Sequence, residues 1–131
     1  MKKIIRPTFL YLRHERVLTV IPCRKRGLYF PGGLRKDGES ACDVLIHEVK
    51  RGLGVDIIPG TLARYGDFET LTAGGDMTVR LECYTGSIDG VINPARDIID
   101  MAYWASYSDL NRFSPSFKDI VTDLESRRML R

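Results

Sequence analysis

The sequence predicts a single α/β or α+β domain spanning residues 1–131. A chain of 131 residues is long enough to bury one hydrophobic core. Its composition, 44% apolar and 28% charged, is that of an ordinary globular protein and excludes a disordered, collagen-like or coiled-coil chain. Strand-like apolar runs and helix-like periodic segments both occur along the chain, and neither internal repeats nor linkers are evident.

The predicted strands are rich in β-branched and aromatic residues. Two such runs, 3–11 and 16–23, are separated by a short charged segment and indicate neighbouring strands. Pro7 lacks a backbone N–H, so the first strand is expected at a sheet edge or beside a bulge. Residues 77–84 alternate apolar with polar side chains, which predicts a half-buried strand. Further strand-like runs lie in 56–70 and 97–105.

Two helices are predicted. Over 40–53, apolar residues recur with the helical period and form a single stripe. Ser40 is a suitable N-cap for this helix, and Gly54 is suited to end it. A second helix is expected after Ser114-Pro115, where apolar residues again follow helical spacing as far as Leu124.

The charge distribution is asymmetric, although the net charge is only +3. Residues 1–36 hold ten Lys/Arg and one acid, a balance of +9, whereas 37–131 hold ten Lys/Arg and sixteen acids, a balance of −6. This split favours an anionic partner for the first third of the chain, with a solvated basic face as the alternative.

Cellular location is predicted from what the sequence lacks. It has no apolar run that could cross a membrane or form a signal peptide. Its three cysteines are odd in number and widely spaced, which argues against a disulfide framework or a structural zinc site. We expect each cysteine to be a small buried apolar residue and the protein to be cytoplasmic.

One segment points to chemistry. Residues 33–55 resemble the Nudix box, G-x5-E-x7-R-E-U-x-E-E-x-G-U, in which U is a bulky aliphatic residue. The matching residues are Gly33, Glu39, Glu48, Val49, Gly54 and Val55. The box is degenerate, because His47, Arg51 and Gly52 stand where the pattern has Arg, Glu and Glu. The approach to the box through 16–33 and the acidic-aliphatic run before Trp104 also resemble this family.

The chain is thus similar to MutT-like members of the Nudix hydrolase superfamily. The resemblance implies an α/β/α sandwich in which a mixed β-sheet lies between helices. It also implies hydrolysis of a nucleoside diphosphate linked to another group, with Mg²⁺ or Mn²⁺ as cofactor. By the resemblance, Glu48 is the catalytic residue and a metal ligand, helped by Glu39 and by a backbone carbonyl of the glycine pair, such as that of Gly32.

The degenerate positions count against this metal site. Positions 48, 51 and 52 share one helix face, where three carboxylates could hold a hard cation. Here Gly52 offers no ligand, and Arg51 replaces a carboxylate with a cation. Two unit charges 4 Å apart interact by roughly 4 kcal/mol at an effective dielectric of ~20, and this interaction changes sign when Glu becomes Arg.

Two replacements for the missing ligands stay open. Carboxylates elsewhere could complete a metal site: Glu39, Glu82, Asp97 and Asp100. Alternatively, Arg51 could contact phosphate directly and take over the neutralisation of its charge.

Several candidate residues also have purely structural interpretations. The glycine pair could serve only a tight turn. Glu48 could form an ordinary salt bridge with Arg51, three residues on. His47 is expected to contribute to ligand binding or to a hydrogen bond with Glu39, or to have no role. The basic turn containing Arg24 and Arg26 could attract phosphates or could only aid solubility.

Three functions follow as hypotheses, and the sequence leaves open whether the protein is an enzyme. The first is binding of a nucleotide or another phosphate-bearing small molecule, with weak or lost pyrophosphate hydrolysis. The second is an active hydrolase that uses Glu48 and carboxylates outside the box. The third, a basic nucleic-acid-binding module, lacks the interleaved aromatic residues typical of such proteins. A membrane partner is not expected, and the resemblance allows a homodimer.

Overall fold

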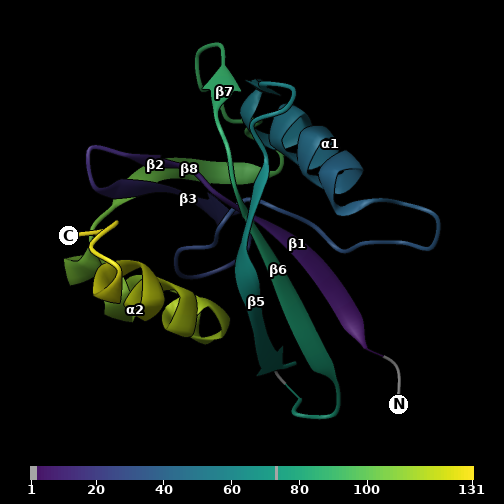
Figure 1. Cartoon of the computed structure of the whole chain (residues 1–131), viewed down its shortest axis with the longest axis vertical. Helices are drawn as coiled ribbons and strands as arrows, with labels where there is room; N and C mark the ends of the chain where they lie inside the picture. Colours follow the sequence, from purple (N-terminus) through teal and green to yellow (C-terminus); the bar gives the residue numbers. More distant parts are fainter. Residues whose placement is uncertain (1–2, 73) are drawn as a thin grey trace.

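A three-stranded mixed sheet forms the centre of the fold (Figure 1). The computed structural model describes residues 3–72 and 74–131. Strand β1 (Ile4–Leu10) runs parallel to β6 (Thr78–Thr85), and β5 (Ala63–Leu71) pairs antiparallel with the other side of β6. In the sheet order β1-β6-β5, the strand that contains Pro7 lies at the edge, as predicted.

The remaining strands form two further sheets. The strands β2 (Leu12–Arg13), β3 (Arg16–Pro22) and β8 (Ile99–Ala105) form an antiparallel sheet, and β4 (Asp56–Ile57) pairs with β7 (Ile88–Asp89). The expectation of a half-buried strand over 77–84 is wrong in part. Leu81, Glu82 and Cys83 of β6 are all buried, because β6 is the central strand and is covered on both faces.

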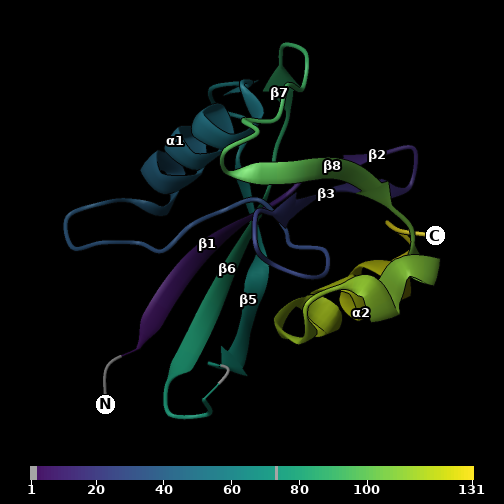
Figure 2. The ribbon, with the colours of Figure 1, turned by 180° about the vertical axis from the view of Figure 1, so that it is seen from behind.

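The helices cover opposite faces of the central sheet, as Figures 1 and 2 show together. Helix α1 (Ala41–Leu53) begins after Ser40, whose Oγ accepts a hydrogen bond of 3.1 Å from the Asp43 backbone N–H. It ends at Gly54, which has a left-handed φ of 70°. The N-cap and the C-cap are both as predicted.

The C-terminal helical region is less regular than predicted. Two 3-10 turns, η1 (Tyr107–Arg112) and η2 (Pro115–Phe117), precede helix α2 (Lys118–Ser126). The fold is therefore the expected α/β/α sandwich with a mixed sheet between helices.

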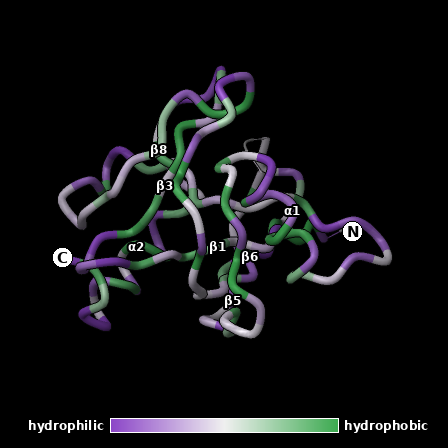
Figure 3. The backbone as a smooth tube through the Cα atoms, turned by 90° about the horizontal axis from the view of Figure 1, so that it is seen from above, coloured by the Kyte–Doolittle hydropathy of each residue, from purple (hydrophilic) through white to green (hydrophobic). Residues whose placement is uncertain are grey.

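Apolar side chains form one core on each face of the sheet. On one face, Phe9 packs with Leu45 and Val49 of α1. On the other, Leu10 packs with Ile120 and Val121 of α2. Neighbouring residues of β1 reach different cores because successive side chains of a strand point to opposite faces. In Figure 3 the long loop before α1 is largely hydrophilic, whereas the strands show hydrophobic stretches mixed with hydrophilic ones.

Hydrogen bonds to two carboxylates stabilise the core on the α2 face of the sheet. The Tyr65 hydroxyl on β5 donates a 2.5 Å hydrogen bond to the Asp123 carboxylate on α2. In the turn after β8, the buried Asp109 accepts hydrogen bonds from the Ser106 N–H at 2.8 Å and from the Arg112 guanidinium at 3.1 Å. Burial alone would raise the pKa of Asp109, but these donors hold it below its usual value.

The prediction that all three cysteines are buried is wrong for two of them. Cys83 is buried in the central strand, Cys23 is partly exposed, and Cys42 is exposed on the outer face of α1. Within residues 3–72 and 74–131, no helix is long and apolar enough to cross a membrane.

Candidate functional site

The glycine pair lies in a loop that runs beside β1. The Phe9 N–H donates to the Pro31 carbonyl at 2.8 Å, and the Arg35 N–H donates to the Ile5 carbonyl at 2.9 Å. A Cβ on Gly32 would lie 2.2 Å from the Pro7 carbonyl oxygen and 2.9 Å from the Arg6 guanidinium. A Cβ on Gly33 would lie 2.8 Å from Cγ of Glu48. The two glycines therefore let the loop pass closely between Arg6 and Glu48.

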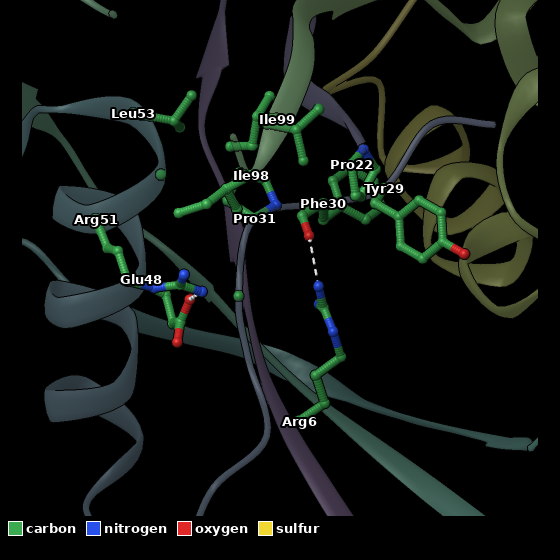
Figure 4. A pocket seen from close by; sticks show the side chains of 13 residues that line it. Arg6, Pro22, Tyr29, Phe30, Pro31, Glu48, Arg51, Leu53, Ile98 and Ile99 are labelled. Carbon is green, nitrogen blue, oxygen red and sulfur yellow. Dashed lines mark hydrogen bonds and ion pairs between the residues drawn. The ribbon is translucent and has the colours of Figure 1, made fainter. Parts of the chain in front are cut away.

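Glu48 is paired with the arginine that replaces a carboxylate of the box. On α1, Nη2 of Arg51 lies 2.7 Å from Oε2 of Glu48, and Figure 4 shows the two side chains together beside the cavity. The Glu48 side chain is 24% exposed and that of Arg51 is 47% exposed, so the pair lies at a partly solvated rim. This contact is the i, i+3 salt bridge that the spacing allowed.

Gly52 has a packing role. Its position on α1 is buried, and a Cβ there would lie 2.8 Å from Cδ1 of Ile99 at the start of β8. A glutamate at this position could enter only if the Ile99 side chain moved. The loss of a carboxylate at position 52 is thus accompanied by an isoleucine that fills the adjacent space.

Arg6 is a site residue that the sequence reasoning missed. Its guanidinium donates to the Phe30 carbonyl at 2.8 Å and to Oγ1 of Thr8 at 3.2 Å, and it lies 5.1 Å from the centre of the Phe117 ring. Burial lowers the pKa of Arg6 to about 10, so it stays charged at neutral pH. A charged residue in an apolar strand, two residues from Thr8 and four from Leu10 on the same face, was the available signal.

These residues line one cavity of about 190 Å³ between α1, the glycine loop and β8 (Figure 4). Its charged lining residues are Arg6, Glu48 and Arg51, which give a formal charge of +1. Apolar groups complete the walls, among them Tyr29 and Ile99. A small concave site with a net positive charge suits an anionic ligand.

Four other predicted site residues lie away from this cavity lining. Arg24 and Arg26 are exposed in the loop after β3. Oε1 of Glu39 accepts a hydrogen bond from the Lys36 N–H at 2.9 Å, so Glu39 closes a turn before α1. The hydrogen bond between His47 and Glu39, one of the alternatives for His47, does not form. Instead, the exposed His47 lies with Nδ1 3.8 Å from Oε1 of Glu48.

The carboxylates outside the box do not gather around Glu48. Asp97 and Asp100 are exposed near β8, and Asp100 accepts a contact of 3.4 Å from the Cys23 thiol. Glu82 is buried in β6, with Arg35 3.7 Å away. Across the described residues, no three His, Cys, Asp or Glu side chains cluster as a metal site requires. The residues around Glu48 therefore do not fit a divalent cation held in the manner of the intact box.

Comparison with known proteins places this architecture in a class. A scan against protein-family models finds no match, and neither does a comparison with curated sequences. Solved structures, in contrast, match over almost the whole chain, and many of them are Nudix or MutT hydrolases. The chain therefore has the Nudix fold.

Three solved structures illustrate the likeness. The Escherichia coli ORF135 protein superposes with a TM-score of 0.80 at 18% identity, over 98% of this chain and 92% of that one. A MutT Nudix hydrolase from Burkholderia pseudomallei gives 0.79 at 15% identity, over 94% and 98%. The MutT protein from Methanosarcina mazei Go1 gives 0.77 at 16% identity, over 96% and 95%.

Proposed function

We propose that the protein binds a nucleotide or a similar phosphate-bearing small molecule in the cavity of Arg6, Glu48 and Arg51. Pyrophosphate hydrolysis is weak or lost. The observation that carries this proposal is the 2.7 Å ion pair between Arg51 and Glu48. It sets a fixed cation beside the only carboxylate that the helix retains from the box.

Arg51 can bind phosphate without releasing Glu48. A guanidinium has five N–H donors, and the salt bridge uses one of them. Charge-assisted hydrogen bonds to phosphate are roughly twice as strong as neutral ones. An arginine cannot, however, generate hydroxide from water as a bound metal ion can. The replacement of a carboxylate of the box by Arg51 therefore favours phosphate binding and disfavours hydrolysis.

The fold supports the choice of ligand class. Structures with this fold include a protein described as a MutT Nudix hydrolase and others described as MutT. By resemblance to that family, the ligand is a nucleoside diphosphate derivative, and the cofactor of the family would be Mg²⁺ or Mn²⁺. Because the residues around Glu48 do not fit such an ion, we propose binding that does not depend on it.

The test is calorimetric titration with a panel of nucleoside monophosphates and diphosphates, in EDTA and in Mn²⁺, with chromatographic analysis for products. We expect binding in EDTA and no measurable turnover in either condition. Arg51→Gln should weaken binding by about tenfold or more, because it removes a charge-assisted hydrogen bond. Lys50→Gln is the matched control, since Lys50 pairs with Asp56 at 3.3 Å and does not line the cavity.

Two results would contradict the proposal. Rapid Mn²⁺-dependent release of products by the wild type would favour the active hydrolase that draws on other carboxylates. Equal affinities in Arg51→Gln and the wild type would show that Arg51 does not bind the ligand.

A further inference from the structure

Two hollows adjoin each other on the sheet formed by β2, β3 and β8, and neither shares a lining residue with the cavity of Arg51. The first, of about 230 Å³, is lined by Arg13, His14, Arg16 and Trp104. The second, of about 370 Å³, is lined by Trp104 together with apolar and charged side chains that include Ile92, Arg96, Asp100 and Met101. The indole of Trp104 therefore borders a basic hollow on one side and a mixed one on the other.

The two arginines of the first hollow form an uncompensated pair of like charges. Arg13 and Arg16 lie directly opposite each other in the β2–β3 hairpin, and both are exposed. Like charges in this position destabilise a strand pair. Within residues 3–72 and 74–131 neither guanidinium forms an ion pair, and the nearby Glu15 carboxylate pairs instead with Nε of Arg131 at 2.7 Å. An anion bound between Arg13 and Arg16 would relieve their repulsion.

The backbone that carries these arginines is fixed before any ligand arrives. His14 and Glu15 form the turn of the hairpin with left-handed φ values of 51° and 59°, which few non-glycine residues adopt. The Glu15 carbonyl accepts a hydrogen bond of 3.2 Å from the Arg131 N–H, and the Arg131 carbonyl accepts one of 2.7 Å from the Tyr107 N–H. Because the turn is tied to the C-terminal residue, ordering it costs little on binding.

Trp104 supplies an accessible aromatic surface beside these cations. Its side chain on β8 is partly exposed, and the ring of Tyr11 lies 5.6 Å away at a tilt of 51°. The Tyr11 ring in turn stacks on that of the buried Phe9 at 6.1 Å. A row of rings thus supports the indole from the core. An accessible aromatic ring next to arginines is suited to unpaired bases, because every base has a face that can stack.

The length of the surface favours a polymer over a single nucleotide. Along β8, the four residues from Asp100 to Trp104 cover about 13 Å at about 3.3 Å each. This length exceeds the spacing of about 3.4 Å between stacked bases severalfold. The charges of Arg13, Arg16 and Arg96 outweigh that of Asp100, which gives a formal charge of +2 with His14 neutral. An extended anion could therefore contact cations on both sides of the indole.

We propose that this surface, the Trp104 groove of Arg13, Arg16, Arg96 and Trp104, binds single-stranded nucleic acid. A base stacks on the indole, and the phosphates beside it contact Arg13 and Arg16. The inference goes beyond the proposed function, which concerns a small molecule in a separate cavity. The sequence shows no interleaving of basic and aromatic residues, but the fold brings Trp104 to arginines far away in the chain.

The fluorescence of Trp104 reports on the groove directly, because it is the only tryptophan of the chain. Titration with a short oligothymidylate should quench this fluorescence as a base stacks on the indole. A duplex should leave it unchanged, because the bases of a duplex are already stacked. Oligoglutamate carries charge without bases and should neither quench the fluorescence nor displace the oligothymidylate.

The salt dependence of binding tests the phosphate contacts. For single strands, log K falls with log[salt] with a slope of about −0.7 for each phosphate that is neutralised. Arg13→Gln combined with Arg16→Gln should therefore reduce the magnitude of the slope by about 1.4, as measured by the anisotropy of fluorescein-labelled oligothymidylate. The control, Lys25→Gln combined with Lys36→Gln, removes the same charge at exposed positions that line neither hollow and should keep the slope.

The stacking contact is tested by Trp104→Leu. This variant should bind labelled oligothymidylate at least about fivefold more weakly, with an unchanged salt slope. Trp104 is partly buried, so the variant could fail to fold. In that case the exposed pair Arg13 and Arg16 and the quenching of the wild type still decide the question. The melting temperature of the double arginine variant should be maintained or raised, because a like-charge pair is removed.

The outcomes separate this inference from the proposed function. The inference is wrong if oligothymidylate does not quench Trp104, or if the double arginine variant keeps the wild-type salt slope. Binding of oligoglutamate as tight as that of oligothymidylate would also overturn it and would indicate an acidic peptide as the partner. Quenching should persist in Arg51→Gln. If binding is lost in Arg51→Gln and retained in the double arginine variant, the strand is held in the first cavity and the Trp104 groove is not its site.

Discussion

Replacing Arg51 with glutamate tests whether this arginine keeps a divalent cation away from Glu48. In the wild type the guanidinium lies 2.7 Å from the carboxylate. A doubly charged ion about 4 Å from Arg51 would be repelled by roughly 8 kcal/mol at an effective dielectric of ~20, before screening. Because the Arg51 side chain is 47% exposed, solvent removes most of this repulsion. We take about 1.4 kcal/mol as the repulsion that remains after screening, which corresponds to about a tenfold change in metal affinity.

Arg51→Glu turns the repulsion between residue 51 and the divalent cation into an attraction. It also places two carboxylates three residues apart on one helix face. At a Mn²⁺ concentration ten times its dissociation constant, binding should add about 1.4 kcal/mol to the free energy of unfolding. For a domain of this size that corresponds to a rise of about 5 °C in the melting temperature. Gly52 is left unchanged, since a Cβ there would press on Ile99 at 2.8 Å.

The assay is thermal unfolding with and without Mn²⁺ in the wild type, Arg51→Glu and Arg51→Gln. The glutamine variant removes the cation without adding a carboxylate, so it should show a smaller response than Arg51→Glu. The reasoning is refuted if the wild type responds to Mn²⁺ as strongly as Arg51→Glu. It is equally refuted if Arg51→Glu does not respond, because the arginine would then not be what excludes the cation.

Three further predictions concern the loop and the polar contacts of the core. Gly32→Ala should lower the free energy of unfolding by about 3 kcal/mol, because its Cβ would lie 2.2 Å from a backbone carbonyl oxygen. The Cβ of Gly33→Ala would meet only the Glu48 side chain, which can move, so this substitution should cost less than about 1 kcal/mol. Equal costs in urea unfolding would contradict this contrast. The lowered pKa of Asp109 means that its stabilisation is present above about pH 4 and is lost as the pH falls through its folded-state pKa. Asp109→Asn should therefore lose less stability than the wild type on acidification, and parallel pH profiles would be the opposing result. Tyr65→Phe should lower the free energy of unfolding by about 1–2 kcal/mol, since it removes a hydrogen bond to a helix carboxylate, and an unchanged thermal transition would argue against it.

The elements that could be predicted from the sequence are those specified by local patterns. Helix α1 follows from its periodicity and from Ser40 and Gly54, and all of these signals lie within one short segment. Strand β4 falls inside the strand-like run predicted over 56–70, whereas the two-residue strand β7 could not be predicted, because it exists only through its pairing with β4. Likewise, the burial of Glu82 depends on the strands β1 and β5 on either side of it, and β1 is far away in the sequence.

The candidate site shows the same division. The contact between Glu48 and Arg51 could be anticipated from their spacing on one helix. The role of Arg6 could not, because the alternation of a strand shows which residues share a face but not which layer covers that face. From the sequence, Gly52 could be interpreted only as a missing metal ligand, because its contact with Ile99 joins residues almost fifty positions apart.

The departures from the box are physically coupled. Arg51 neutralises Glu48, Ile99 fills the space that a side chain at position 52 would need, and Arg6 adds a further charge across the glycine pair. A cation held by carboxylates and an anion held by arginines would compete for the same space beside Glu48. Restoring a single carboxylate would therefore weaken anion binding before it produced a complete metal site. On this reasoning, intermediate variants should bind phosphate less well than the wild type and still fail to hydrolyse it.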